Sequence, residues 1–375
     1  MRRWCCSFGS GIVLLVTTKF SSGFTTTQMQ NLFQLTRSLM TKKDKNIIMS
    51  ATTSSHLVTI PDAIAAHKKK STDIKFIDGS WHMPIGDNPR NGRAEFITGP
   101  RIHGALYFDI DDIAPAMGSD DNPKKLPHMK PSAKMFASAM DRMKIKPSDT
   151  LYVYATLGCA FYHRAYWTLR SCGHDPNLVK LVQGSLDEWK KFGGELEEMT
   201  LVEGVDERLF RMKDLCWEDN TPTYQCVGNT EDVVVDMHQV LKIVNQKDGD
   251  AVIVDARAAG RFDGTTPEPR PGLRAGHMPG ALNVPFTDLL LDTDKTKFRP
   301  MDEVRDIFIK AGISQVSGDD PARKVVCSCG SGVTAAALAI GLEECGLRKR
   351  EDISIYDGSW IEWGSDDNTP IVTSL

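Results

Sequence analysis

The sequence predicts an α/β fold of two tandem domains, each a mainly parallel sheet flanked by helices. Three motifs recur in the same order, 174 to 177 residues apart, which indicates a duplicated domain. Within each copy, apolar runs alternate with helical segments, as in parallel sheets covered on both faces. The 375 residues, 41% hydrophobic and 25% charged, have an ordinary globular composition that excludes collagen, coiled coil and general disorder.

The repeated motifs lie at the ends of predicted strands and at turns. An apolar run ends in Asp, a Gly-Ala-Leu turn follows, and a Gly-Ser motif closes each copy. The pairs are Phe-Ile-Asp 76–78 and Ile-Val-Asp 253–255, Gly-Ala-Leu 104–106 and 280–282, and VQGSLDEW 182–189 and YDGSWIEW 356–363. We therefore predict an N-terminal domain at 55–200, an extended linker at 201–225 and a C-terminal domain at 226–370.

Each copy offers the same elements in order. A strand that ends in Asp comes first, then the turn and a short extended run, a second strand, a Gly-containing loop, a helix and a final strand. The first strands are 75–78 and 251–255, the second strands 150–154 and 324–328, and the helices 162–171 and 333–345.

The net charge of −4 conceals an uneven distribution. Residues 1–43 hold six basic residues and no acidic one, whereas the remainder holds 39 basic and 49 acidic residues, a net of −10. A basic segment rich in Ser and Thr is typical of a transit peptide, so we predict a presequence at 1–50 and a mitochondrial location. A plastid location, or a cytoplasmic product started at Met40 or Met49, stays open. The charge favours no nucleic-acid partner, and no stretch is long enough to span a membrane.

Nine cysteines are too few for a disulfide scaffold, and their odd number suggests a reducing compartment with one reactive thiol. Cys329 is the candidate, because an apolar strand carries it into a glycine loop that leads to a helix. Gly330, Gly332, Val333 and Thr334 are expected to form a cradle whose N–H groups stabilise a thiolate or a persulfide. We interpret Cys327, on the same strand, as structural.

Two other kinds of site are excluded by what the sequence lacks. Phosphatases with a cysteine loop need Arg at the sixth residue after Cys, and here that residue is Ala335. No group of residues has metal-ligand spacing, so we expect neither a metal nor an organic cofactor.

The loop Cys329–Ala335 (CGSGVTA) and the closing motif 356–363 resemble the tandem-domain rhodanese family, in its 3-mercaptopyruvate sulfurtransferase branch. The resemblance covers nearly all of residues 55–365. It implies an enzyme that moves sulfane sulfur from 3-mercaptopyruvate through a Cys329 persulfide to thioredoxin, a small thiol or cyanide, with release of pyruvate. A thiosulfate:cyanide sulfurtransferase and a non-catalytic rhodanese-type binding protein remain alternatives. The thiosulfate branch usually carries basic residues after the cysteine, and this loop has none.

The resemblance also implies further site residues. Arg261 and Arg270 map to the pair that grips the substrate carboxylate and keto oxygen, and Asp111, His128 and Ser331 map to an acid–base relay. In the first copy, a spacing of 173 residues equates Thr156 with Cys329. We therefore expect the first domain to be catalytically inactive.

Overall fold

The computed structural model describes residues 56–84, 87, 89–197, 221–227, 233–246, 251–313 and 324–373. The predicted presequence 1–50 and residues 201–220 of the predicted linker lie outside this part of the chain. Within it, no helix is both long and apolar enough to cross a membrane.

The first repeat is built on a sheet of five parallel strands in the order β1-β6-β5-β2-β4. A small antiparallel pair, β3 with β7, lies outside it. The strands are β1 (Leu57–Thr59), β2 (Ile74–Asp78), β3 (Arg101–Ile102), β4 (Leu106–Tyr107), β5 (Thr150–Ala155), β6 (Val179–Ser185) and β7 (Leu196–Glu197).

The second repeat has a five-stranded parallel sheet in the order β8-β12-β11-β9-β10, which is the same topology. Its strands are β8 (Val234–Val235), β9 (Ala251–Asp255), β10 (Leu282–Asn283), β11 (Lys324–Ser328) and β12 (Ile353–Tyr356). The Gly-Ala-Leu turns also correspond, because Gly104 and Gly280 both adopt a left-handed φ, of 75° and 76°. The predicted pair of parallel α/β domains is thereby confirmed.

Helices flank both sheets. In the first repeat they are α3 (Ile60–His67), α4 (Gly92–Thr98), α5 (Ala133–Arg142), α6 (His163–Ser171), η1 (Pro176–Leu178) and α7 (Leu186–Lys191). In the second they are α8 (Met237–Asn245), α9 (Ala259–Asp263), η4 (Phe286–Leu289), α10 (Met301–Lys310), α11 (Ala335–Glu344), η5 (Arg350–Asp352) and α12 (Ser359–Trp363).

Local sequence explains how the outer helices begin. In α8 the Asp236 carboxylate accepts the N–H of Gln239 at 2.8 Å, and the Gln239 side chain accepts the N–H of Asp236 at 2.9 Å. This reciprocal capping satisfies two helix-end donors. In α5 the Ser132 hydroxyl accepts the N–H of Met135. Helices α6 and α11 have no side-chain cap; their buried residues anchor them instead.

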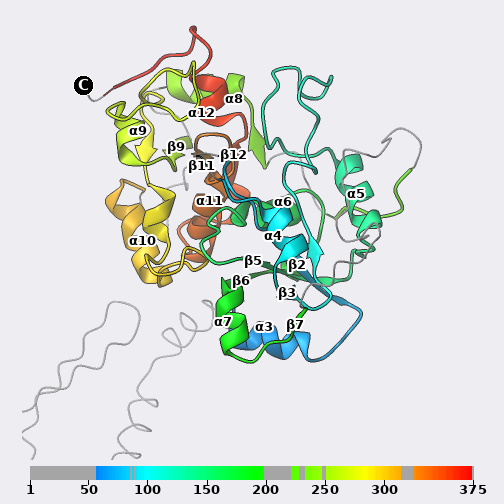
Figure 1. The fold of residues 1–375 in the computed structure, drawn as a ribbon. Helices are drawn as coiled ribbons and strands as arrows, with labels where there is room; N and C mark the ends of the chain where they lie inside the picture. The colour runs from blue at the N-terminus through cyan, green and yellow to red at the C-terminus, as the bar shows by residue number, and fades with distance from the viewer. Residues whose placement is uncertain are drawn as a thin grey trace, which may run out of the picture. The chain divides into compact units, whose positions relative to one another are not determined.

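The alternation of side chains along each strand separates the cores. Phe76 packs with residues of α3 and α7, whereas Ile77 joins a larger core that includes residues of both repeats. On β11, Cys327 likewise faces this larger core and Val326 faces the opposite side. Helices α6 and α11 pack against each other and so form one of the contacts between the repeats (Figure 1).

Strand register corrects one predicted equivalence. Asp78 of β2 pairs with Tyr154, and Asp255 of β9 pairs with Ser328, so Tyr154 and Ser328 correspond. The residue that corresponds to Cys329 is therefore Ala155. The Thr156 assignment was wrong by one residue, because the two strand ends are 174 residues apart and not 173, so a single spacing does not hold along the whole repeat.

The described end of the predicted linker packs on the first repeat. Tyr224 is buried, its ring lies edge-on to Phe136, and its hydroxyl bonds with Nδ1 of His174 at 2.6 Å. Residues 221–227 thus have no regular secondary structure, yet they are docked through an aromatic side chain.

Candidate active site

Cys329 lies directly after β11, at the carboxyl edge of the second sheet, and is 2% exposed. The N–H of Gly332 donates to its Sγ at 3.1 Å. The cysteine backbone is held from α12 and the turn before it. Its N–H donates to Oγ of Ser359 at 3.2 Å, and its carbonyl accepts the N–H of Trp360 at 3.0 Å. The sulfur is therefore fixed against an N–H donor in a tight loop.

Gly332 cannot be replaced without a change in the loop. Its φ of +83° lies in the left-handed region, and a Cβ there would come within 2.9 Å of the carbonyl oxygen of Asp357. The structure also corrects the expected start of the helix, because α11 begins at Ala335 and Thr334 is its N-cap residue. The amide that contacts the sulfur belongs to the loop and not to the first turn of the helix.

The other described cysteines differ chemically from a nucleophile. Burial raises the pKa of Cys159 and of Cys345 to about 11, and that of Cys172 to about 12. Burial, together with the neighbouring Cys329, raises the pKa of Cys327, and burial raises that of Cys226. These thiols stay protonated at neutral pH, which supports the structural interpretation of Cys327.

Asp111 and His128 lie together, as the resemblance implies. Nδ1 of His128 contacts the Asp111 carboxylate, which also accepts the indole N–H of Trp81 at 2.8 Å. The Trp81 ring packs edge-on to the imidazole, with centroids 4.7 Å apart. Ser331 is 2% exposed in the cysteine loop. Within the described part of the chain its hydroxyl makes no hydrogen bond to His128. That link of the predicted relay is therefore open in this structure.

The two substrate-binding candidates have different surroundings. Arg261, on α9, pairs with Glu268 at 2.5 Å, and its Nη2 lies 3.1 Å from where a Cβ on Gly330 would be. Its guanidinium is therefore beside the cysteine loop. Arg270 lies in the loop after α9, is partly exposed, and has no ion-pair partner among the described residues.

A buried arginine of the first repeat also reaches the loop, and the sequence did not single it out. Arg164 of α6 donates to the carbonyl of Gly332 at 3.0 Å and pairs with Asp357 at 2.7 Å. The Lys130 N–H donates to the other oxygen of Asp357 at 2.5 Å. The closing Gly-Ser motif, for which the sequence predicted no role at the cysteine, thus carries the groups that hold the cysteine. The signal available was the Gly-Ser pair that recurs at the end of the last strand in both copies.

Comparison with known proteins agrees with this geometry. A rhodanese-like domain model matches residues 237–366. The probable 3-mercaptopyruvate sulfurtransferase of Schizosaccharomyces pombe is 31% identical over 83% of this chain and 93% of its own. The mitochondrial thiosulfate/3-mercaptopyruvate sulfurtransferase 1 of Arabidopsis thaliana is 33% identical over 86% of this chain and 79% of its own.

Among solved structures, SseA of Escherichia coli, a 3-mercaptopyruvate sulfotransferase, superposes with a TM-score of 0.61. It is 30% identical and covers 82% of this chain and 99% of its own. Relatives above 30% identity over 79% to 93% of their own length, the shared domain and the duplicated sheet all agree. The chain therefore belongs to the tandem-domain rhodanese family, in its 3-mercaptopyruvate sulfurtransferase branch.

Proposed function

We propose that this protein is a sulfurtransferase that takes sulfane sulfur from 3-mercaptopyruvate on Cys329 and passes it to a thiol or to cyanide. The observation that carries the proposal is the Cys329 loop. It directs the Gly332 N–H at the sulfur, contains no cationic side chain, and has the Arg261 guanidinium beside it. This arrangement suits a donor whose negative charge lies away from the reacting sulfur.

The first half-reaction is a nucleophilic displacement on sulfur. The Cys329 thiolate attacks the thiol sulfur of 3-mercaptopyruvate, an S–S bond forms, and the bond between that sulfur and carbon 3 breaks. The electron pair moves into the pyruvate enolate, and a proton adds at carbon 3 to give pyruvate. The donor thiol loses one proton and the enolate gains one, so the step leaves a persulfide anion on Cys329. Amides of Gly330, Gly332, Val333 and Thr334 stabilise this anion.

Asp111, His128 and Ser331 handle that proton in the proposal. The Asp111–His128 contact fixes the orientation of the imidazole ring for proton transfer. Closure of the open link between His128 and Ser331 is expected when substrate is bound, because catalytic hydrogen bonds often tighten only in the complex. Arg261 and Arg270 hold the carboxylate and keto oxygen, for which planar guanidinium groups are well suited.

The second half-reaction returns the enzyme to its starting state. A thiophile attacks the outer sulfur of the persulfide, takes that sulfur, and releases the Cys329 thiolate. Thioredoxin, small thiols and cyanide are the proposed acceptors, and the kinetics are ping-pong.

The test compares the two donors. Steady-state turnover is measured with 3-mercaptopyruvate and with thiosulfate, both with the same acceptor. Intact-mass analysis after donor treatment detects the added sulfur. We expect preference for 3-mercaptopyruvate and an adduct that is absent in Cys329→Ser. Strong preference for thiosulfate favours the alternative enzyme, and the Arabidopsis relative carries both donors in its name. No adduct on the wild type favours the non-catalytic binding protein.

We also propose that the first repeat, 55–200, is inactive and that 226–370 is the catalytic domain. Ala155 offers no sulfur at the position of Cys329, and the nearby Cys159 thiol is buried with a raised pKa. Cys159→Ser is expected to keep full turnover.

A mitochondrial location is the last part of the proposal. It rests on the acid-free basic segment 1–43 and on the Arabidopsis relative named as mitochondrial. Imaging of a C-terminal fluorescent fusion, with and without residues 1–50, tests it. A plastid signal, or a cytoplasmic signal from the full chain, contradicts it.

A further inference from the structure

Arg164 is a buried cation on α6 of the first repeat, with its side chain 1% exposed. We propose that Arg164 is a positioning residue for the reaction at Cys329, supplied by the repeat that carries no thiol at that position. The inference rests on the proposed function, since it assigns to the first repeat a role in persulfide formation. It predicts that the reaction rate depends on Arg164 beyond any effect of Arg164 on folding.

One guanidinium makes three contacts with both sides of the site. Its Nη1 donates to the Gly332 carbonyl at 3.0 Å, and its Nη2 donates to the His128 carbonyl at 2.7 Å. Nη2 also lies 2.7 Å from Oδ1 of Asp357. The group stacks on the Trp167 ring of the same helix, 4.6 Å from the ring centroid, which fixes its plane. Arg164 thus bridges the cysteine loop, the relay histidine and the closing motif.

The contact with Gly332 sets the direction of the cradle amides. The N–H of Gly332 donates to the cysteine sulfur, and the Gly332 carbonyl points to Arg164. In a trans peptide the next N–H, that of Val333, points opposite to this carbonyl. Holding the carbonyl therefore orients the Val333 amide directly and restrains residue 332, whose own N–H contacts the sulfur, and both amides are donors proposed for the persulfide anion.

The other two contacts act on the partners of the sulfur. His128 has a left-handed φ of 59°, which a non-glycine residue adopts at a cost, so an anchor on its carbonyl helps to keep the imidazole in place. Asp357 lies two residues before Ser359, whose hydroxyl accepts the Cys329 N–H. Fixing Asp357 therefore steadies the turn that holds the cysteine backbone.

Lysine could not reproduce this arrangement. A guanidinium presents five donors in one plane, whereas an ammonium is a compact point charge. Lysine could still neutralise Asp357, but it could not reach both carbonyls from the same position with the same directions. Arg164→Lys therefore separates the charge of the residue from its geometry.

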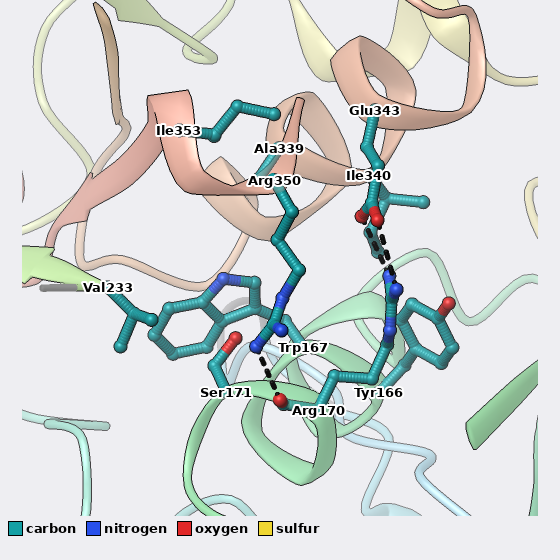
Figure 2. Close-up of a pocket in the computed structure, with 10 residues that line it drawn as sticks. All are labelled: Tyr166, Trp167, Arg170, Ser171, Val233, Ala339, Ile340, Glu343, Arg350 and Ile353. Carbon is teal, nitrogen blue, oxygen red and sulfur yellow. Dashed lines mark hydrogen bonds and ion pairs between the residues drawn. The ribbon is translucent and has the colours of Figure 1, made fainter. Parts of the chain in front are cut away.

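The chain provides a matched control on the same helix. Arg170 of α6 also pairs across the repeats, donating to both carboxylate oxygens of Glu343 on α11 at 2.7 and 3.0 Å (Figure 2). Figure 2 shows this pair with Arg350, which donates to the Arg170 carbonyl. Glu343 is near the C-terminal end of α11, whereas the cysteine loop precedes its N-terminus. Arg170→Met thus removes a buried inter-repeat ion pair and leaves the cradle alone.

The experiment uses the full chain with Arg164→Met, Arg164→Lys and Arg170→Met. Single-turnover persulfide formation is followed by rapid quench and intact mass. The rate of Cys329 alkylation by iodoacetamide, at one fixed pH, measures the reactivity of the cysteine in its loop when no sulfur donor is present. Thermal midpoints report stability. We expect both Arg164 variants to slow persulfide formation and alkylation by about tenfold or more, since small misplacements at a reacting centre can cost about a hundredfold. Arg170→Met is expected to stay within about twofold of wild type despite its lost ion pair.

The outcomes separate the two proposals. Equal rates in Arg164→Met and Arg170→Met, at similar thermal midpoints, overturn the positioning role. Full activity in Arg164→Lys overturns it as well, and this variant covers the case in which Arg164→Met does not fold. If the wild type forms no persulfide, the proposed function fails, and alkylation still reports whether Arg164 orders the cysteine loop.

Discussion

Two aspartates at the same position of the two repeats provide a sharp test of how burial controls stability. Asp78 ends β2 and Asp255 ends β9, and each is 1% exposed. Each carboxylate accepts an N–H from the residue two positions on, at 2.9 Å. In the second repeat that residue is Arg257, whose guanidinium also pairs with Asp255 at 2.7 Å. In the first repeat it is Ser80, which carries no charge.

The missing cation has a calculable consequence. Burial, partly offset by hydrogen bonds from Ser80, raises the pKa of Asp78 from 3.8 to about 6. A change of about two pKa units corresponds to about 3 kcal/mol, at 1.36 kcal/mol per unit. The folded chain holds this proton to higher pH than the unfolded chain. Ionisation of Asp78 in the folded chain therefore carries a penalty in folding free energy. This penalty is absent below pH 4, grows as the pH rises through 6, and is complete above it.

Asp78→Asn is expected to remove most of this penalty, because the amide keeps the shape and cannot ionise. At pH 8 the variant should be more stable than wild type by up to about 3 kcal/mol, and at pH 4 the two should be nearly equal. Asp255→Asn is the matched control. It removes one of the two carboxylates that pair with Arg257 at 2.7 Å, the other being Glu268, and should lose up to about 3–5 kcal/mol, the usual cost of breaking a buried pair.

Denaturant unfolding of the three proteins between pH 4 and 8 measures these differences. Thermal midpoints provide a second measure, with about 2–4 °C expected per kcal/mol in a unit of this size. An Asp78→Asn chain that is less stable than wild type at pH 8 would refute the reasoning. A difference that stays constant across the pH range would refute it equally, since the penalty must follow the ionisation of Asp78.

Three further predictions concern the reaction. Arg261→Ala or Arg270→Ala should raise KM for 3-mercaptopyruvate about tenfold or more. Single-turnover sulfur transfer to the acceptor should be unchanged. Equal damage to persulfide formation and to sulfur transfer would indicate misfolding. Cys327→Ala should retain persulfide formation, because burial keeps that thiol protonated; loss of the adduct at a normal thermal midpoint would contradict this. Gly332→Ala should abolish persulfide formation. Gly346→Ala is the control, because Gly346 is also left-handed but has open space around it, and it should cost only about 1–2 kcal/mol of stability. Normal activity in Gly332→Ala would show that the loop tolerates a Cβ.

The sequence predicted those parts of the fold that depend on local pattern. Apolar runs placed β9 and β11 correctly, and glycines around Cys329 marked the loop, because strand periodicity and glycine conformations are set by neighbouring residues. The start of α11 was placed two residues early. Val333 and Thr334 precede an alanine-rich helix, and only the loop contacts show that they stay outside it.

The contacts between the repeats were beyond reach from the sequence. Arg164 lies 168 residues from Gly332, and an arginine on a helix is ordinarily assigned to solvent. Its burial follows from the packing of α6 on α11, which no spacing in the chain encodes. The contact within the second repeat between Ser359 and Cys329 was also not predicted, because it joins two turns that the sequence places 30 residues apart.

The guanidinium between the repeats bears on how the two halves of a duplicated gene can diverge. With Ala155 at the position of the thiol, the corresponding loop of the first half is not required to hold a persulfide. Position 164 is different, because the other half has come to depend on it. The halves can therefore change at unequal rates but cannot be exchanged independently. A chimera that pairs one half with that of a distant relative must carry the arginine together with its three contact partners, the Gly332 and His128 carbonyls and the Asp357 carboxylate.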